Sequence, residues 1–212
     1  PVGMCISLLL AVMLDQKIAF RKFYRAAFFL PSITSMVVVA IVWQWIYNPD
    51  YGLLNYFLSL FGIKGPKWLL DANTSLISLA IVGIWKKAGY NMIIFLSGLQ
   101  GISYSYYEAS MLDGANKWQQ FRYITLPMLK PTTFFVFVMT VIGSFQVFDQ
   151  IMLMTKGGPG RSSSVLVHYL YQNAFQYFKL GYACAIAYLL FFIVMGITVF
   201  NMRMEKSMRE IY

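Results

Sequence analysis

Five long runs of apolar residues alternate along the chain with shorter polar segments. A helix needs roughly 20 mostly apolar residues to cross the hydrocarbon core of a bilayer. The pattern predicts membrane-spanning helices at about residues 2–14, 26–47, 74–100, 132–154 and 180–202. The first run is too short to cross and residue 1 is Pro rather than Met, so we expect a truncated first span in a piece of a longer chain. The expected fold class is all-α, a polytopic membrane protein with one transmembrane domain over residues 1–212.

The composition agrees with a membrane protein, since 59% of the residues are hydrophobic and 12% are charged. A net charge of +9 is also typical of nucleic-acid-binding proteins, but the distribution of Lys and Arg argues against such a partner. Cytoplasmic segments of membrane proteins are rich in Lys and Arg. Ten of the 17 basic residues fall in the alternate segments that we therefore place inside: Lys17, Arg21, Lys22, Arg25, Lys117, Arg122, Lys130, Arg203, Lys206 and Arg209. An inner tail after five spans puts residue 1 outside, so at least one further span is expected before it.

The polar segment 103–127, between the third and fourth runs, has the pattern of two short helices. Ser105 and Glu108 have the spacing of a capping box, which predicts a helix start at Ser105. Gly114 can end or bend that helix. A second amphipathic helix is expected from Ala115, stopping where Pro127 and Pro131 follow. The segment therefore predicts a compact helical knob on the inner face of the membrane.

The residues of this knob resemble the EAA loop of membrane permease subunits in bacterial binding-protein-dependent ABC importers. The matching positions, with the full spacing intact, are Glu108, Ala109, Gly114, Ile124, Leu126 and Pro127. Ser110 stands where the family usually has a second alanine, and Asp113 and Phe121 resemble the carbohydrate-uptake, maltose-type branch. Other stretches along nearly the whole chain resemble the same family, among them the Gly-Gly-Pro segment at 157–159.

The resemblance implies a transmembrane subunit of an ATP-driven sugar importer in the bacterial plasma (inner) membrane, with its C-terminus in the cytoplasm. It also implies three kinds of partner: a second permease subunit, either a copy of this chain or a related protein, a cytoplasmic ABC ATPase dimer and an extracytoplasmic solute-binding protein. No cofactor is expected, because ATP is bound by the ATPase. The residues implied to couple the subunit to the ATPase are Glu108, Ala109, Ser110, Asp113, Gly114, Ile124, Leu126 and Pro127. An alternative role for Glu108 is to complete the capping box alone.

Polar residues within the apolar runs are candidates for a substrate pathway. Lys86 and Lys87 interrupt the third run, where they either snorkel or mark a broken helix, or else border a water-filled path. Gln146, Asp149 and Gln150 would share one face of a helix in the outer half of the fourth run, although Asp149 could instead cap its polar end. The candidates are Lys87, Tyr90, Asn91, Gln146, Asp149 and Gln150.

Other functions are less well supported by the residues. Close relatives within the resembled family carry glycerol phosphate or other small solutes, and an ion-coupled secondary transporter would need no ATPase. An enzyme is not expected, because no Ser–His, Cys–His or paired-carboxylate constellation is evident. Lys156 precedes the glycines of 157–160 rather than following them, so these glycines are not a P-loop. His168 is the only histidine, and Cys5 and Cys184 lie in apolar runs, so no metal site or disulfide is expected.

Overall fold

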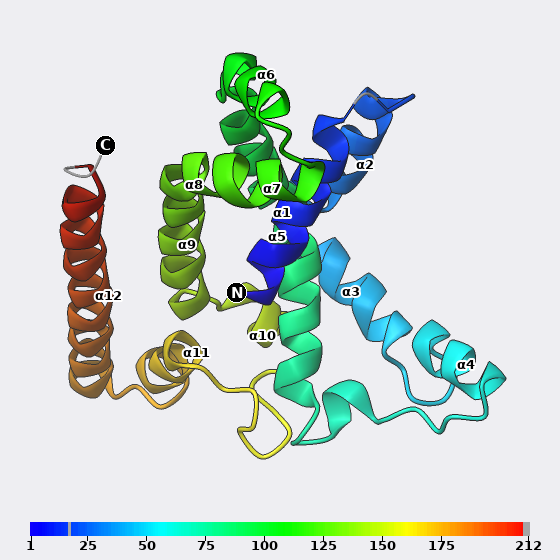
Figure 1. The fold of residues 1–212 in the computed structure, drawn as a ribbon. Helices are drawn as coiled ribbons and strands as arrows, with labels where there is room; N and C mark the ends of the chain where they lie inside the picture. The colour runs from blue at the N-terminus through cyan, green and yellow to red at the C-terminus, as the bar shows by residue number, and fades with distance from the viewer. Residues whose placement is uncertain (17, 210–212) are drawn as a thin grey trace. The chain divides into compact units, whose positions relative to one another are not determined.

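The computed structural model describes residues 1–16 and 18–209, and the regular elements in that part of the chain are all helices (Figure 1). The first elements are α1 (Val2–Asp15), α2 (Arg21–Ile33), α3 (Met36–Ile46), α4 (Leu53–Leu60), the 3₁₀ helix η1 (Trp68–Leu70) and α5 (Ser75–Gln100). Next come α6 (Tyr104–Leu112), α7 (Lys117–Gln120), the π helix η2 (Phe121–Thr125), α8 (Leu126–Met128) and α9 (Lys130–Phe145). The last are α10 (Asp149–Met154), α11 (Leu166–Tyr171), the π helix η3 (Gln172–Gln176) and α12 (Leu180–Arg209). The predicted all-α class is confirmed for these residues. Lys17 and the side chains of Lys206 and Arg209 lie outside what is described.

The chain forms two compact units. Unit 1 comprises Pro1–Ile33, Trp85–Thr140 and Arg203–Tyr212. Its core joins three helices, with Ala11 and Leu14 from α1, Met92, Phe95, Leu96 and Leu99 from α5, and Leu129 and Val136 at and beyond the start of α9. α2 packs closely on α5 in this unit, because a Cβ added at Gly89 would overlap the carbonyl oxygen of Phe28. The Ser32 hydroxyl also donates to the Lys86 carbonyl oxygen at 2.9 Å.

Unit 2 comprises Thr34–Ile84 and Val141–Met202. Its core includes Val39, Ala40 and Tyr47 from α3, Leu79 and Val82 from α5, and Ile151 and Met154 from α10. The Tyr47 hydroxyl is buried and donates to the Ser78 carbonyl oxygen at 3.0 Å. This bond satisfies a polar group that would otherwise be costly to bury, and it ties α3 to α5.

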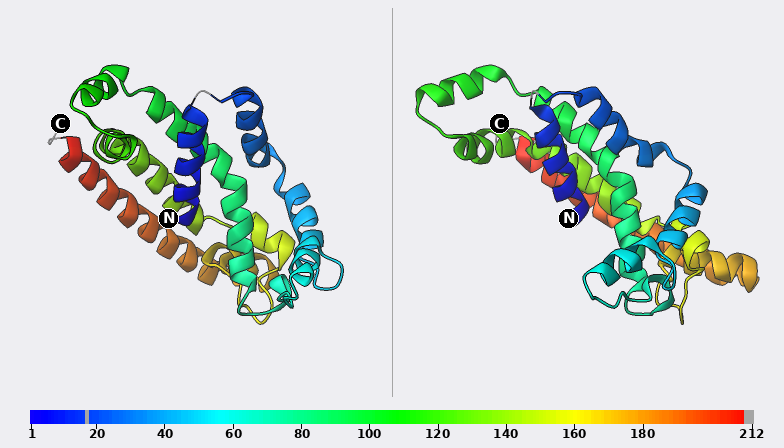
Figure 2. Two further views of the ribbon diagram at one scale, coloured as in Figure 1. Left: turned by 45° about the vertical axis from the view of Figure 1, so that its right-hand side comes forward. Right: turned by 90° about the vertical axis from the view of Figure 1, so that its right-hand side faces the viewer.

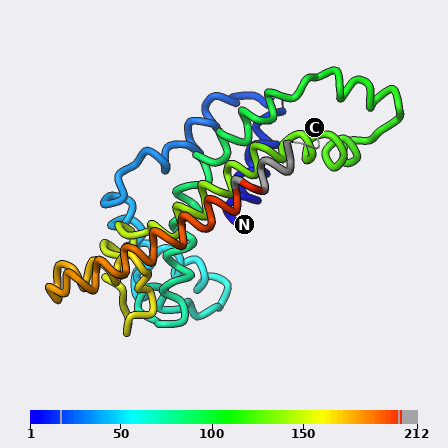
Figure 3. Tube along the Cα trace, turned by 90° about the vertical axis from the view of Figure 1, so that its left-hand side faces the viewer, coloured from blue at the N-terminus to red at the C-terminus, as the bar shows by residue number. Residues whose placement is uncertain are grey.

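Two of the predicted spans are continuous helices. α5 covers Ser75–Gln100, and the Leu180–Asn201 part of α12 is the more apolar of the two. Figure 3 shows α12 as one long, unbroken helix. Both are long and apolar enough to cross a membrane. Since α5 runs without interruption past Lys86 and Lys87, the idea that these lysines mark a broken helix is wrong.

The other predicted spans are shorter or interrupted. Residues 26–47 divide into α2 and α3, and α3 begins after Ser35, whose side-chain oxygen accepts from the Val37 N–H at 3.4 Å. Residues 132–154 divide into α9 and α10, with 146–148 between them. Counting each of two bent helix pairs as one span gives up to four spans in the described residues, and α1 is a shorter apolar helix. The number five therefore stays a prediction.

Candidate functional site

The knob predicted at 103–127 is an elbow of two helical arms in unit 1. Its first arm is α6, which begins at Tyr104 with Ser103 as the N-cap. The predicted capping box of Ser105 and Glu108 is wrong, because Ser105 is already inside the helix, where its hydroxyl lies 2.8 Å from that of Ser103. Glu108 is exposed in the middle of α6 and has no part in its N-terminal cap.

The bend of the elbow is at Gly114, and the prediction that this residue ends the helix is confirmed. Gly114 has φ +78°, in the left-handed region that favours glycine. The Ala115 N–H donates to the Ser110 carbonyl oxygen at 2.9 Å, and the Gly114 N–H donates to that of Met111 at 3.1 Å. This pair of bonds is the Schellman motif, which satisfies carbonyl groups at the end of a helix.

The second arm is formed by α7, η2 and α8. It starts at Lys117 rather than Ala115, because Asn116 and Gln119 make a reciprocal capping box. It continues through Pro127 to Met128, so the predicted stop at Pro127 is also wrong. The Leu126 N–H donates to the Phe121 carbonyl oxygen, which makes a π turn just before the proline. This wider turn already departs from α-helical bonding, and Pro127 is accommodated within the arm.

Hydrogen bonds between side chains join the two arms. The hydroxyl oxygens of Tyr107 and Thr125 are 2.9 Å apart, and the Gln120 amide donates to the Ser110 hydroxyl oxygen at 3.0 Å. Gln120 is 4% exposed and Thr125 6% exposed, so both polar side chains are buried within the elbow. The sequence analysis did not identify Tyr107, Gln120 or Thr125, because partners 10 and 18 residues apart follow no local pattern.

The outer surface of the elbow carries large apolar side chains that nothing in the described chain covers. Leu112 is 90% exposed, Tyr123 73%, Trp118 69% and Met111 42%. Glu108, Ala109, Asp113 and Gly114 are exposed on the same arms, whereas Ile124, Leu126 and Pro127 are half-buried. Figure 2 shows α6 and the turn after it standing apart from α1 and the second half of α5. Exposed apolar side chains gathered in this way are typical of a surface that binds a partner.

Three pathway candidates lie on the part of α5 that belongs to unit 1. Lys87 and Tyr90 are exposed, and Asn91 is buried at 7% exposure. The neighbouring Lys86 is held by the protein, since its ammonium group donates to the Pro31 carbonyl oxygen at 3.1 Å. Lys87 and Tyr90 are therefore the members of this group that remain accessible to a solute.

The other three candidates lie in unit 2, and they do not share a helical face. Gln146 is exposed in the break after α9, whereas Asp149 is the first residue of α10. Asp149 is exposed and lines a hollow of about 410 Å³ with Ser35, Met36, Val37, Phe148, Met152 and Leu153. Gln150 is buried and donates to the Leu79 carbonyl oxygen, which gives it a structural role. The prediction of a single polar face is wrong because the helix breaks between Phe145 and Asp149.

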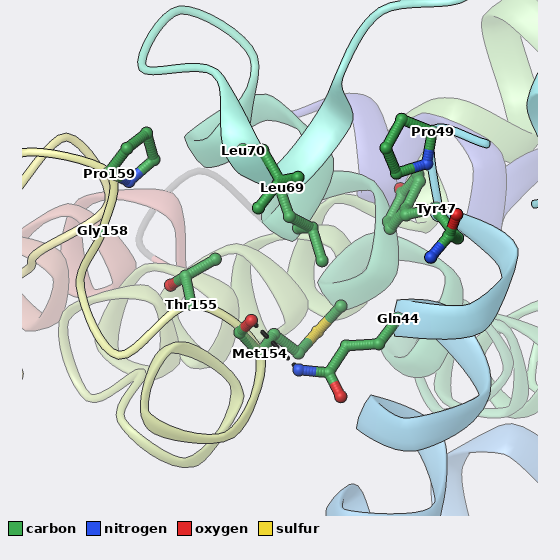
Figure 4. A pocket seen from close by; sticks show the side chains of 10 residues that line it. Gln44, Tyr47, Pro49, Leu69, Leu70, Met154, Thr155, Gly158 and Pro159 are labelled. Carbon is green, nitrogen blue, oxygen red and sulfur yellow. Dashed lines mark hydrogen bonds between the residues drawn. The ribbon is translucent and has the colours of Figure 1, made fainter.

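Unit 2 also contains a hollow of about 370 Å³ that the sequence analysis did not anticipate (Figure 4). Its walls are Gln44, Tyr47, Asn48, Pro49, Leu69, Leu70, Met154, Thr155, Gly158 and Pro159. The Gln44 amide points at the end of α10 and donates to the carbonyl oxygens of Leu153 and Met154, each at 3.1 Å. These bonds hold α3 against α10, so part of the polar wall is engaged in packing.

No cluster of metal-ligating side chains occurs among the residues that the structure describes. His168 is 1% exposed, and its Nδ1 lies 3.0 Å from the Ser164 hydroxyl oxygen. Burial lowers the pKa of His168, because the charged imidazolium would lose its hydration. The burial of His168 and its hydrogen bond with Ser164 indicate that it holds α11 against the preceding segment, which is a structural role.

Comparison with known proteins places these features in context. The family model described as "Binding-protein-dependent transport system inner membrane component" matches residues 3–204. The probable ABC transporter permease protein YurN of Bacillus subtilis is 39% identical over 207 residues, which cover 96% of this chain and 71% of that protein. The arabinooligosaccharides transport system permease protein AraP of the same organism is 32% identical over 207 residues, which cover 96% of this chain and 66% of that protein.

Two further similarities bear on substrate and fold. The sn-glycerol-3-phosphate transport system permease protein UgpA of Agrobacterium fabrum is 36% identical, with coverage of 97% of this chain and 70% of that protein. A chain in the crystal structure of a bacterial alginate ABC transporter, in complex with an alginate pentasaccharide-bound periplasmic protein, superposes with a TM-score of 0.88. It is 27% identical, and the match covers 97% of this chain and 72% of that chain. The sequence therefore spans about two thirds to three quarters of the proteins that it resembles.

Proposed function

The chain belongs to the family of binding-protein-dependent transport system inner membrane components, and from this premise we propose that it is a permease subunit of an ATP-driven carbohydrate importer. The expected family is thus confirmed, and it is a family of membrane transport components rather than enzymes. In this role the subunit forms half of a translocation path and couples it to a separate ATPase.

The observation that carries this proposal is the outer surface of the elbow. Its exposed leucine and aromatic side chains, together with the exposed carboxylate of Glu108 on the first arm, are suited to enter a cleft of a partner that offers apolar walls and a basic group. The glycines at 157–160 lack the arrangement of a P-loop, and in this proposal ATP is bound and hydrolysed by the partner ATPase. The elbow is the surface through which that polypeptide would act.

In this proposal the chain crosses the bacterial inner membrane several times, with the elbow and the C-terminus in the cytoplasm. The excess of Lys and Arg in segments 15–25, 117–130 and 203–209 supports this orientation. Taking α1, the bent pair α2 and α3, α5, the run that divides into α9 and α10, and α12 as one span each would give the five spans of the sequence prediction. The second bent pair that is apolar enough for a span joins 117–128 of the elbow to α9 rather than α9 to α10. The exposed elbow fits this topology, because a polar and charged bend is costly within lipid.

The proposed partners are a second permease subunit, an ATPase dimer and an extracytoplasmic solute-binding protein. The similar transporter structure contains a periplasmic protein, which supports the last of these. α12 supports a helical neighbour, since only 11% of its apolar window is buried within the chain. Small residues on α12, among them Gly181 and Ala185, would let another helix approach closely.

The proposed solute is a saccharide, since the relative AraP is named for arabinooligosaccharides and the similar structure for alginate. The relative UgpA keeps glycerol phosphate as a second candidate. Uptake into proteoliposomes that hold the complete complex, tested with maltose, an arabinose oligosaccharide and sn-glycerol 3-phosphate, separates the two. The proposal requires uptake that depends on ATP inside and persists when ion gradients are collapsed. Uptake driven by an ion gradient without ATP would identify a secondary transporter instead.

Charge reversal of Glu108 to lysine is expected to uncouple the transporter. The substitution lies on an exposed helical position, so insertion and thermal stability should remain near those of the wild type. A lysine would repel the basic group that we expect on the ATPase, so uptake should fall at least about tenfold, equivalent to about 1.4 kcal/mol of coupling. The measurement is solute uptake and ATP hydrolysis in the same vesicles. Glu108→Gln, which removes the charge without reversing it, should be intermediate, and full activity of both variants would contradict this role.

The pathway residues that remain accessible are Lys87, Tyr90, Gln146 and Asp149, and we expect their polar groups to contact the solute. Asp149→Asn keeps the shape of the side chain but replaces a charged acceptor, so it should raise the apparent uptake constant about three- to tenfold, as expected for loss of a charge-assisted bond. Asp50→Asn in the exposed segment after α3 is the matched control. If Asp149→Asn and Tyr90→Phe both leave the uptake constant unchanged, these residues do not line the path.

A further inference from the structure

Four residues inside the elbow are linked by two hydrogen bonds between side chains and two from side chains to backbone carbonyl oxygens, and we call them the brace: Tyr107, Ser110, Gln120 and Thr125. The Gln120 amide donates to the Ser110 hydroxyl oxygen at 3.0 Å, and the Ser110 hydroxyl donates to the Tyr107 carbonyl oxygen at 2.8 Å. On the other side, the Thr125 hydroxyl donates to the Gln120 carbonyl oxygen at 3.4 Å. With that proton committed, the Tyr107 hydroxyl donates to Thr125. In each of the four bonds one group donates and the other accepts, and no hydroxyl proton is used twice.

The brace crosses from one arm of the elbow to the other at two separate points. Tyr107 and Ser110 lie on α6, whereas Gln120 and Thr125 lie at the end of α7 and in η2. The π turn contributes to this arrangement, because Thr125 reaches back five residues to the Gln120 carbonyl oxygen. Both residues of the second arm are buried, at 4% and 6% exposure, so water competes little for their bonds.

The covalent joint between the arms is held by the two Schellman bonds, which run back to Ser110 and Met111 of α6 and do not reach the second arm. Gly114 has φ +78°, it is exposed, and no atom would lie within 4 Å of a Cβ placed on it. A glycine with open space around it can change its backbone angles with little steric resistance. The angle between the arms is therefore held by contacts between α6 and the second arm rather than by the turn itself.

From this geometry we infer that the brace makes the elbow a rigid lever that passes displacement from its outer surface to α9. The inference rests on the proposed function, because it assigns a mechanical role within the coupling of ATPase and path. Without the brace, a push on Leu112 or Glu108 would be resisted only by the Schellman turn at Gly114, and α6 would pivot there without moving the second arm. With the arms braced, the same push moves η2 and α8 together with α6, and α8 leads directly into α9 through Leu129, which is buried in the core of unit 1.

The brace also gives Ser110 a role that an alanine at that position could not fill. Its hydroxyl is both the acceptor for Gln120 and the donor to Tyr107. Removing it would leave the buried Gln120 amide without this partner. Tyr107, Ser110, Gln120 and Thr125 are thus positioning residues, since they act on transport through the exposed surface and not by touching ATP or solute.

The test removes two hydroxyl groups and keeps the shapes of the side chains, in the variant Tyr107→Phe with Thr125→Val. Spin labels are placed at Ser105 on α6 and at Arg122 on η2, both exposed, after Cys5 and Cys184 have been replaced by alanine. In the assembled complex the distribution of distances between the labels should be narrow in the wild type and at least twice as wide in the double variant. In unlabelled proteoliposomes, solute taken up per ATP hydrolysed should fall about five- to tenfold, measured with whichever of the three uptake probes the wild type carries.

Two controls separate positioning from general damage. Thr125→Ser restores the hydroxyl and should keep both the narrow distribution and the wild-type ratio of uptake to ATP hydrolysis. Tyr106→Phe removes a hydroxyl from a tyrosine of α6 that is 53% exposed, and it should change neither measurement. A loss of folded protein alone would lower uptake and ATP hydrolysis together and leave their ratio unchanged, and that result would overturn the inference.

The outcome also distinguishes this inference from the proposed function. If the wild type shows ATP-driven uptake, Glu108→Lys uncouples it and the double variant keeps its normal ratio and a narrow distribution, then only the brace is wrong. If the wild-type complex shows no ATP-driven uptake, the proposed function is wrong and the brace fails with it.

Discussion

Replacing Gly114 by arginine is expected to abolish solute uptake while leaving the protein inserted in the membrane. Gly114 holds φ +78°, a conformation that costs residues other than glycine roughly 1 kcal/mol or more. An arginine would either strain the Schellman turn or open it, and in both cases it would turn α6 away from its present direction. Its long, charged side chain would also stand on the outer surface of the elbow, beside Leu112. Because the position is exposed, the helices of the unit 1 core should be unaffected.

The measurement for Gly114→Arg is uptake together with stimulation of the ATPase by the solute-loaded binding protein, and both should fall below about 1% of wild type, or by more than about 2.7 kcal/mol. A matched control is Gly62→Arg, because Gly62 has φ +71° and likewise no atom within 4 Å of a Cβ, but it follows α4 in unit 2. That variant carries the same backbone strain and should keep most of its transport. Normal uptake by Gly114→Arg would remove the elbow from the coupling mechanism.

Replacing Gly89 by alanine is expected to have the largest effect on folding. A Cβ at this position would overlap the carbonyl oxygen of Phe28 and come within 3.0 Å of the Phe29 Cα, so α2 and α5 would have to move apart. The obstructing atoms are backbone and cannot rotate away as the end of a flexible side chain would. Overpacking of a tight contact costs typically 1–3 kcal/mol, and we expect a loss of about 3 kcal/mol here.

The measurement for Gly89→Ala is the thermal stability of the detergent-solubilised protein, with the yield of inserted protein as a second readout. Gly196→Ala in α12 is the control, because no atom lies within 4 Å of a Cβ placed there and alanine favours a helix. Gly196→Ala should be as stable as the wild type or slightly more so. An unchanged melting temperature in Gly89→Ala would show that α2 does not pack against α5 in this way.

The helices that could be predicted from sequence were those whose apolar pattern continues for their full length. α5 and the apolar Leu180–Asn201 part of α12 are of this kind, and they lie close to the predicted residues 74–100 and 180–202, although α12 itself continues to Arg209. The breaks at Ser35 and at 146–148 escaped prediction because apolar residues continue on both sides of them. A hydroxyl that caps a helix within an apolar run gives little signal in a hydrophobicity pattern, since serine is also tolerated inside such helices.

In the elbow, too, features set by neighbouring residues could be predicted from sequence, whereas contacts between distant residues could not. Gly114 was predictable because the end of a helix commonly requires a left-handed residue. The capping box at Asn116 and Gln119 was also available as a local pattern, although Ser105 and Glu108 were chosen instead. The contact of Tyr107 with Thr125 could not be found in this way, because it depends on the angle at which the two arms fold together.

The exposure of Leu112 has a consequence for the biosynthesis of the complex. If the ATPase covers Leu112 as proposed, this leucine would stay exposed on any copy of the subunit made in excess of its ATPase. Such orphan copies should be recognised by quality-control proteases at the tip of the first arm, where the chain is accessible and bends sharply. The cell would thus have to produce the two polypeptides in matched amounts. Leu112, which would contact the ATPase in the complex, would also shorten the lifetime of a permease subunit that has no ATPase bound.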